Sequence, residues 1–188
     1  MARPRSDEKR SAIMSAAIRV IASQGLGAAT ATIAKEAEVS NGSLFTYFET
    51  KADLFNQLYV ELKTEMASAA VDGLPIDGDV REQMLHIWTH WLRWATAYPE
   101  KRRTLALLGV SDDIAFESHQ AAGKAMADIA NILERSRKNG PMRDAPLGFV
   151  GALMNAVAEA TIDYIVRDPA GADRHGLAGF EALWRVVA

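Results

Sequence analysis

Short hydrogen-bonding side chains gather between residues 40 and 47 of this chain. They are Ser40, Asn41, Ser43, Thr46 and Tyr47, and no long acidic side chain lies among them. Hydroxyl and amide groups of this size can meet the donors and acceptors on the edges of base pairs, and they can also bind phosphates. The segment therefore predicts a surface that enters the major groove of DNA.

Two short helices and a tight turn are expected to present this surface. Ile33, Ala34 and Ala37 share one face of the first short helix, and Leu44 and Phe48 of the second can close over that face. The polar residues of the second helix then point outward. This pattern is typical of a helix-turn-helix with a polar recognition helix.

Helical periodicity continues through almost the whole chain. Further helices are expected near residues 6–24, 51–71, 79–98, 99–109, 112–138, 146–167 and 176–187. No alternating strand pattern of useful length appears, so the predicted fold class is all-α with about nine helices. Residues 1–50 are expected to form a three-helix domain with the helix-turn-helix, and residues 51–188 a C-terminal helical bundle.

Composition and charge agree with this interpretation. The 188 residues contain no cysteine, which fits a reducing cytoplasm, and the net charge is −3. Residues 1–51 carry seven Lys or Arg against five Asp or Glu, a net charge of +2, and the remaining residues carry −5. A mildly basic front on an acidic body suits a protein that presents one end to phosphates. Without a signal peptide or a transmembrane stretch, the predicted location is cytoplasmic, with no membrane partner.

Several residues of the helix-turn-helix occur in a fixed frame. They are Ile33–Ala34 with Ala37, Val39–Ser40, Gly42, the run Leu44–Phe48, and Lys51 with Leu54–Phe55. In these residues the chain resembles the TetR family of bacterial transcriptional regulators (TetR/AcrR-like). The resemblance implies a homodimeric transcription regulator, a repressor in sign, which binds a near-palindromic DNA operator and is released by a small apolar or amphipathic effector. Residues 51–188 would then bind the ligand and form the dimer.

The DNA-binding residues follow from the helix-turn-helix and this resemblance. They are Thr30, Thr32, Ser40, Asn41, Gly42, Ser43, Thr46, Tyr47 and Lys51. The resemblance implies that Lys51, at the start of its helix, binds a phosphate together with the helix N-terminal amides. The Tyr47 ring is expected against the core of the motif, with its hydroxyl toward a phosphate.

Three positions depart from the family pattern. Glu38 stands where glycine is usual in the turn, so a left-handed backbone there is expected to cost about 1 kcal/mol. Phe45 stands where tyrosine is common, which removes one phosphate-binding hydroxyl. Ala29 replaces a capping threonine, so Thr30 or Thr32 is expected to cap the first short helix.

Aromatic and methionine side chains in the middle of the chain are candidates for an effector cavity. The predicted ligand-binding residues are Met84, Trp88, Trp91, Trp94, Tyr98, Phe116, Met126 and Tyr164. Rows of this kind at helical spacing also occur as ordinary core, so that alternative stays open. The stripe Asn155, Glu159 and Asp163 could place a carboxylate inside the cavity, or it could face solvent or a partner.

Small residues at a spacing of four characterise the helix near 146–167. Gly148, Ala152, Ala156 and Ala160 make a smooth stripe, and the last helix carries a large apolar face. One interpretation is packing within a single bundle, and the other is a four-helix interface between two subunits. The predicted dimer-interface residues are Gly148, Ala152, Ala156, Ala160, Phe180 and Trp184.

The sequence gives little support for a catalytic site or a metal site. His86 and His90 lie four residues apart, the spacing of two metal ligands, but a solvated polar helix face explains them better. There is no cysteine nucleophile, no glycine-rich phosphate loop, and no serine with an identifiable histidine and acid. No catalytic residue, metal or cofactor is therefore predicted. The rival interpretations are a helical adaptor for protein partners and a small all-α enzyme.

Overall fold

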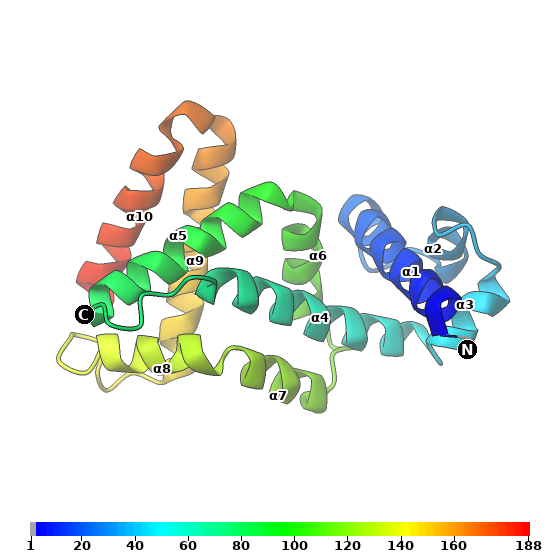
Figure 1. The fold of residues 1–188 in the computed structure, drawn as a ribbon, viewed down its shortest axis with the longest axis horizontal. Coiled ribbons are helices and arrows are strands. Elements are labelled where there is room, and N and C mark those ends of the chain that lie inside the picture. Colours follow the sequence, from blue (N-terminus) through cyan, green and yellow to red (C-terminus); the bar gives the residue numbers. More distant parts are fainter. Residues whose placement is uncertain (1–2) are drawn as a thin grey trace. The chain divides into compact units, whose positions relative to one another are not determined.

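The computed structural model describes residues 3–188, with side chains from Asp7 onward. Ten α-helices and one short 3-10 helix make up this part of the chain, and it contains no strand (Figure 1). The predicted all-α fold, with an N-terminal helix-turn-helix and a C-terminal helical region, is confirmed.

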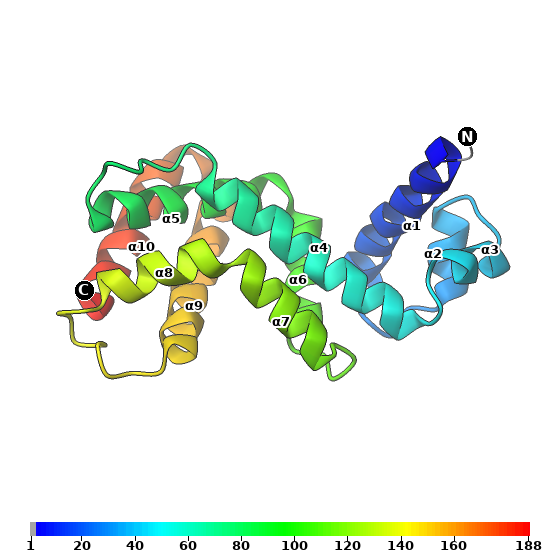
Figure 2. The same cartoon turned by 60° about the horizontal axis from the view of Figure 1, so that its bottom comes forward.

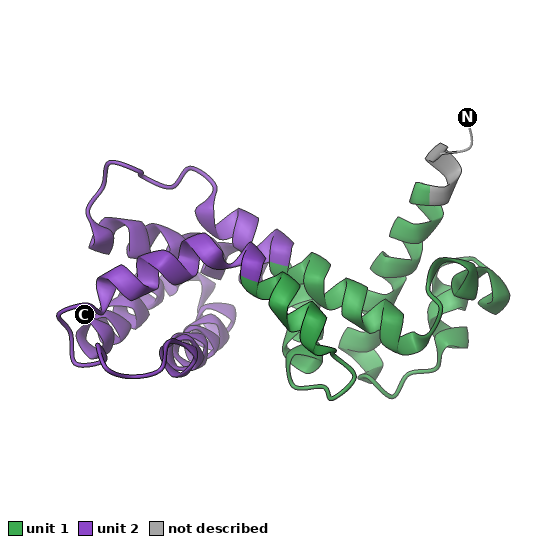
Figure 3. Ribbon diagram, turned by 90° about the horizontal axis from the view of Figure 1, so that it is seen from below, with its two compact units in different colours: residues 1–63, 98–123 green, residues 64–97, 124–188 purple. Residues whose placement is uncertain are grey.

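The helices form two compact units (Figure 3). The first unit comprises residues 1–63 and 98–123, and the second comprises residues 64–97 and 124–188. Helix α4 (Lys51–Val71) and helix α7 (Phe116–Ala125) each contribute residues to both units.

The first unit contains α1 (Arg3–Gln24), α2 (Thr30–Glu36), α3 (Asn41–Tyr47), the start of α4, α6 (Pro99–Gly109) and most of α7. The helices α1, α2 and α3 lie next to one another (Figure 2). Ile13, Ile33, Leu44 and Phe48 are fully buried between them. The predicted apolar face of the helix-turn-helix is therefore the face that forms the core.

The second unit contains the end of α4, α5 (Val80–Ala97), α8 (Ala127–Ser136), α9 (Leu147–Arg167), η1 (Pro169–Gly171) and α10 (Ala172–Val187). Helices α9 and α10 lie side by side, and α5 contacts both. Trp88, Val150 and Phe180 are fully buried in this core. A side chain at Gly179 would collide with Thr161 and Trp88, so glycine allows the close approach of α10.

The structure differs from the sequence prediction in three places. The helix predicted over 112–138 is two helices, because Met126, with φ −92° and ψ 3°, leaves the helical conformation between α7 and α8. Helix α10 begins at Ala172, about one turn earlier than predicted. Helix α9 is also long and apolar enough to cross a membrane by length and composition, with a mean hydropathy of 1.4, where no such stretch was expected.

Candidate functional site

The turn between α2 and α3 ends the first short helix by a Schellman motif. Glu38 has a left-handed backbone with φ 56°, as predicted from its place in the turn. Its amide donates to the Lys35 carbonyl at 3.1 Å, and the Val39 amide donates to the Ala34 carbonyl at 2.9 Å. These bonds satisfy the last carbonyls of α2 and direct the chain into α3. Glutamate in this conformation is strained by about 1 kcal/mol.

Helix α3 begins at a serine cap. The Ser43 amide donates to the Ser40 hydroxyl oxygen at 3.0 Å, and the Leu44 amide donates to the Ser40 carbonyl at 3.1 Å. Leu44 and Phe48 are completely buried. The cap and these two apolar side chains therefore fix which face of α3 points outward. The Ser40 hydroxyl can still donate its proton to another group.

The outward face of α3 holds the predicted polar residues. Ser40, Asn41, Gly42 and Thr46 are exposed, and Ser43 and Tyr47 are half-buried. The Thr46 hydroxyl donates to the Gly42 carbonyl at 3.2 Å, so its oxygen remains open as an acceptor. A side chain added at Gly42 would meet nothing within 4 Å, so the protein itself leaves this surface open.

The predicted threonine cap of α2 is wrong. The N-cap residue is Ala29, which has no side-chain capping bond, and α2 begins with Thr30. The Thr32 amide donates instead to the Ala29 carbonyl at 2.9 Å. Thr30 and Thr32 are both half-buried in the first turn of α2.

Lys51 is held within the first unit at the start of α4. Its ammonium donates to the Leu26 carbonyl at 2.6 Å and lies 5.3 Å from the centroid of the Phe55 ring. An ammonium has three donors, so one bond to Leu26 leaves two for a phosphate. Lys51 therefore fastens the loop between α1 and α2 as well as standing at a helix N-terminus.

A polar network that sequence reasoning did not find braces α1 against α4. Arg10 donates to the Gln57 amide oxygen at 3.0 Å and to Glu61 at 3.3 Å, and it lies over the Phe48 ring. Gln57 donates to Asp53 at 2.8 Å. Arg10 and its partners are about fifty residues apart, so no local spacing pattern could have indicated this network.

The predicted ligand-binding residues have different environments in the two units. In the second unit, Met84, Trp88 and Trp94 are core residues with 5% exposure or less. The Trp88 indole donates to the Gly176 carbonyl at 2.8 Å, and the Trp94 indole donates to Glu65 at 2.9 Å.

The other predicted ligand-binding residues are more accessible. Trp91 and Met126 are half-buried, and Tyr164 is exposed. Tyr98 and Phe116 belong to the first unit and are exposed there. The proposed ligand-binding role of all eight residues stays a prediction.

A groove of about 260 Å³ lies in the second unit between α5, the end of α9 and the start of α10. Its lining consists of Leu85, Thr89, Leu92, Arg93, Thr96, Ile165, Ala172, Asp173, Gly176 and Leu177. None of these residues was among the predicted ligand-binding set. Sequence reasoning singled out the large aromatic side chains of α5, whereas the groove is lined by the smaller residues of a neighbouring stripe.

The two histidines of α5 lie together without forming a metal centre. Their rings are stacked, with centroids 3.8 Å apart. His86 Nε2 bonds the Asp72 carbonyl at 2.8 Å, and His90 Nδ1 bonds the His86 carbonyl at 2.9 Å. Over the described residues, no group of three or more histidine or acidic side chains is placed to hold a metal.

The small-residue stripe of α9 is an exposed surface of the second unit. Gly148, Ala152, Ala156 and Ala160 are all exposed. Large apolar side chains on α9 and α10 are also exposed, namely Phe149, Tyr164, Val166, Leu177 and Val186. Trp184 is half-buried, but Phe180 is buried inside its own unit, with Arg81 over its ring. Phe180 therefore offers no surface to a partner.

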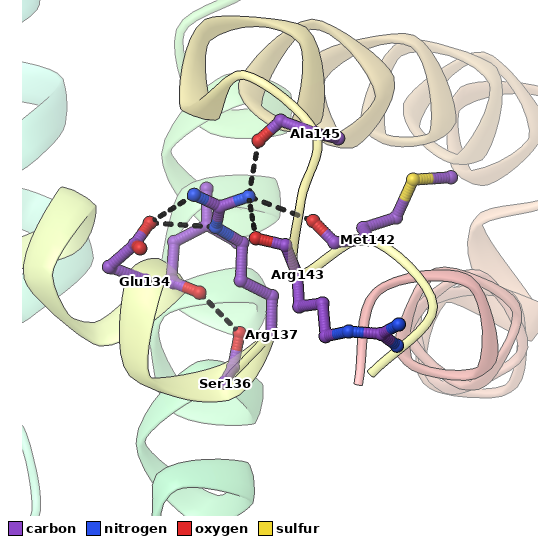
Figure 4. Close-up of polar contacts among 7 residues, drawn as sticks. Glu134, Ser136, Arg137, Met142, Arg143 and Ala145 are labelled. Atoms are coloured by element: carbon purple, nitrogen blue, oxygen red, sulfur yellow. Dashed lines mark hydrogen bonds and ion pairs between the residues drawn. The ribbon is translucent and has the colours of Figure 1, made fainter. Parts of the chain in front are cut away.

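One buried arginine organises the loop between α8 and α9 (Figure 4). Arg137 is 7% exposed and donates to the carbonyls of Met142 at 2.8 Å, Arg143 at 3.2 Å, and Ala145. The Nε and Nη2 atoms of the same guanidinium both lie against one carboxylate oxygen, Oε2 of Glu134, at 2.7 and 2.6 Å. The charge is thus paired and most of its donors are used, as burial requires.

The same loop also meets the end of α10. A side chain at Gly140 would collide with the Val187 carbonyl and with Ala188. The loop therefore holds the start of α9 through Arg137 and the end of α10 through Gly140.

Known proteins share both the helix-turn-helix motif and the fold of this chain. Residues 13–58 match the family described as bacterial regulatory proteins, tetR family. A protein of known structure from Shewanella sp. PV-4, described as a tetR family transcription regulator, is 29% identical with a TM-score of 0.83, over 94% of this chain and 96% of that chain. A TetR family transcription regulator from Marinobacter aquaeolei VT8 is 23% identical with a TM-score of 0.84, over 97% and 96%.

A more distant neighbour in fold is the transcriptional regulator FadR from Bacillus subtilis, in complex with stearoyl-CoA. It is 17% identical with a TM-score of 0.69, over 95% of this chain and 99% of that chain. The predicted resemblance to the TetR family is confirmed by the match over the helix-turn-helix and by the shared fold. These relatives are transcription regulators, which agrees with the prediction of a protein that is not an enzyme.

Proposed function

This chain has the fold of TetR family transcription regulators, and we propose that it is a DNA-binding, ligand-responsive repressor that works in the cytoplasm as a homodimer. The observation that carries the proposal is the outward face of α3. It presents Asn41, Gly42 and Thr46 to solvent on a helix that Ser40 caps and that Leu44 and Phe48 anchor. Short, uncharged hydrogen-bonding groups on a rigid helix suit the edges of base pairs.

Dimerisation is part of this proposal because one recognition helix covers too few base pairs for useful specificity. The exposed apolar face of α9 and α10 supports it. Ala152, Ala156 and Ala160 would allow close approach of a second copy, and Phe149 and Val186 supply exposed apolar area. Two copies of this hairpin would form a four-helix interface about a two-fold axis. The operator would accordingly be nearly palindromic.

The effector is proposed to bind the C-terminal region of the chain, within residues 51–188. The complex of the Bacillus subtilis neighbour with stearoyl-CoA supports the idea that this fold accepts an amphipathic ligand. Helix α4 is continuous from Lys51 to Val71, with its first part in the unit of the helix-turn-helix and its last turns in the other unit. Release of DNA then requires that the effector bind the two states of the protein with different affinity.

Selection of bound fragments from a genomic DNA pool tests the proposal. A near-palindromic sequence is expected, bound as a dimer, and its position would identify the regulated gene. Transcription from that promoter, with and without the protein, then decides between repression and activation. Failure to enrich any sequence would contradict the proposal and favour the helical adaptor, which would bind a protein partner instead.

Lys51→Ala measures the phosphate contact. The salt dependence of binding, log K against log salt concentration, should become shallower by about 0.9 per phosphate, or roughly 1.8 per dimer. Lys35→Ala, on the exposed side of α2, is the matched control. An unchanged slope with lowered stability would show that Lys51 only fastens the Leu26 carbonyl.

A further inference from the structure

The groove of the second unit has an apolar floor. Apolar side chains line it: Leu92 is buried, Ile165 is half-buried, and Leu177 is 51% exposed. Gly176 lacks a side chain where one would lie 3.5 Å from the Leu92 methyl. The Gly176 carbonyl accepts the buried Trp88 indole at 2.8 Å, which holds α10 against α5 at this point. The groove is thus a fixed feature of the packing between these helices.

The polar groups of the groove lie along one stripe of α5. Thr89, Arg93 and Thr96 are spaced by four and three residues, so they line the same side. The Leu92 carbonyl at 2.9 Å and the Arg93 carbonyl at 3.1 Å share the single proton of the Thr96 hydroxyl, which leaves the hydroxyl oxygen as an acceptor. The guanidinium of Arg93 is exposed and forms no ion pair within 4.0 Å among the described residues.

The acid on the opposite rim has a structural explanation. Asp173 lies in the first turn of α10, where the helix dipole stabilises a negative charge. The Asp173 carboxylate and the Arg93 guanidinium form no ion pair within 4.0 Å. The groove thus carries two opposite charges on two helices, and a carboxylate bound in it would lie at the Arg93 side and away from Asp173.

We propose that the groove binds a small molecule with an apolar body and a single carboxylate. The carboxylate pairs with the planar fork of Arg93, and the apolar body lies against Leu92, Ile165 and Leu177. A volume of about 260 Å³ lies just below the range of drug-sized pockets, roughly 300–1,000 Å³, so the ligand is small. The further statement that this molecule is the effector rests on the proposed function.

Isothermal titration of the 188-residue chain with matched probes tests the groove. Octanoate and benzoate carry the carboxylate, octanol lacks the charge, and octylamine reverses it. The carboxylates should bind, octanol should bind about tenfold more weakly because it lacks the charge-assisted bond, and octylamine, which meets the Arg93 charge with its own, should bind more weakly than octanoate. Equal binding of octylamine and octanoate, or no binding of either carboxylate at millimolar concentration, would overturn the proposal.

Two arginine variants locate the binding. Arg93→Gln should weaken octanoate binding about tenfold and leave octanol binding unchanged. Arg185→Gln, at an exposed arginine of α10 that does not line the groove, should leave both unchanged. Circular dichroism confirms that each variant is folded. An Arg93→Gln protein that binds octanoate like the wild type would place the carboxylate elsewhere and refute the assignment.

DNA binding separates this inference from the proposed function. If octanoate binds through Arg93 and weakens operator binding, both stand. If it binds through Arg93 without any effect on operator binding, the site stands and its role as effector site is refuted. If the protein selects no DNA sequence but still binds octanoate through Arg93, the proposed function fails and the groove assignment holds.

Discussion

Two exposed surfaces of this protein differ in polarity. The face of α3 in the first unit carries short polar side chains, among them Asn41 and Thr46. The face of α9 and α10 in the second unit carries small and apolar ones, among them Ala156 and Phe149. On both surfaces, one side of a helix is not covered by the rest of its own unit. Only the α3 surface carries side chains that can form hydrogen bonds with a partner.

The difference indicates what each surface can bind. Base edges and phosphates offer donors and acceptors, so a surface for them needs polar groups held in a fixed direction. A second protein copy offers apolar area, and burial of such area is the main favourable term in association. A contiguous exposed apolar face is a sign of an interaction site, and α9 has a mean hydropathy of 1.4.

The largest expected effect comes from placing a charge on the apolar face. Ala156→Arg would bury an unpaired guanidinium in the proposed interface, at a cost of roughly 3–5 kcal/mol in dimer stability. Sedimentation should show a monomer, and operator binding should be lost. Ala97→Arg, at an exposed alanine at the end of α5, is the control. A dimeric Ala156→Arg protein would mean that this face is not the interface.

A smaller effect is expected at the loop that leads into this face. Arg137→Lys keeps the positive charge but loses the planar fork, so some of the three carbonyls and Glu134 lose their donors. The free energy of unfolding should fall by about 2 kcal/mol in urea denaturation. Arg143→Lys is the matched control, because only the carbonyl of Arg143 takes part in the network. Equal stability of the two variants would show that the buried fork contributes nothing.

A third prediction concerns the turn at Glu38, which sets the direction of the polar helix α3. Glu38→Gly removes the strain of the left-handed backbone and should raise the free energy of unfolding by about 1 kcal/mol. Glu38→Ala removes the same charge but keeps the strained Cβ, so it should bring no such gain. Thermal denaturation of both variants measures the difference. A similar gain in both would attribute the effect to charge and not to backbone strain.

The smallest effect is expected at the connection between α9 and α10. The hydrogen bond from His175, at 2.8 Å, holds the pKa of Asp168 below its usual 3.8. A lowered carboxyl pKa stabilises the folded state above the ordinary value, and this contribution is lost as pH falls through the folded pKa. The stability of the wild type relative to Asp168→Asn should therefore decrease as the pH falls below about 4. A constant difference over this range would show that the bond does not contribute.

The sequence by itself determined the helix-turn-helix and the positions of most of the helices. Burial of Ile33, Leu44 and Phe48 and the outward polar face of α3 could be predicted from the residues, and the family resemblance implied the left-handed turn at Glu38. These features depend on contacts within a few turns of helix, where side-chain spacing fixes the face and the turn. The extents of α4 and α6 were predicted for the same reason.

Only the tertiary structure decided which side chains meet across long separations. Arg10 donates hydrogen bonds to Gln57 and Glu61, and the Trp88 indole donates one to the Gly176 carbonyl. No local sequence pattern predicts these pairs. Phe180 was predicted at a subunit interface, yet its own unit buries it beneath Arg81. Apolar periodicity shows that a side chain will be buried but not by which partner, because packing and orientation are set by the helices that happen to lie opposite.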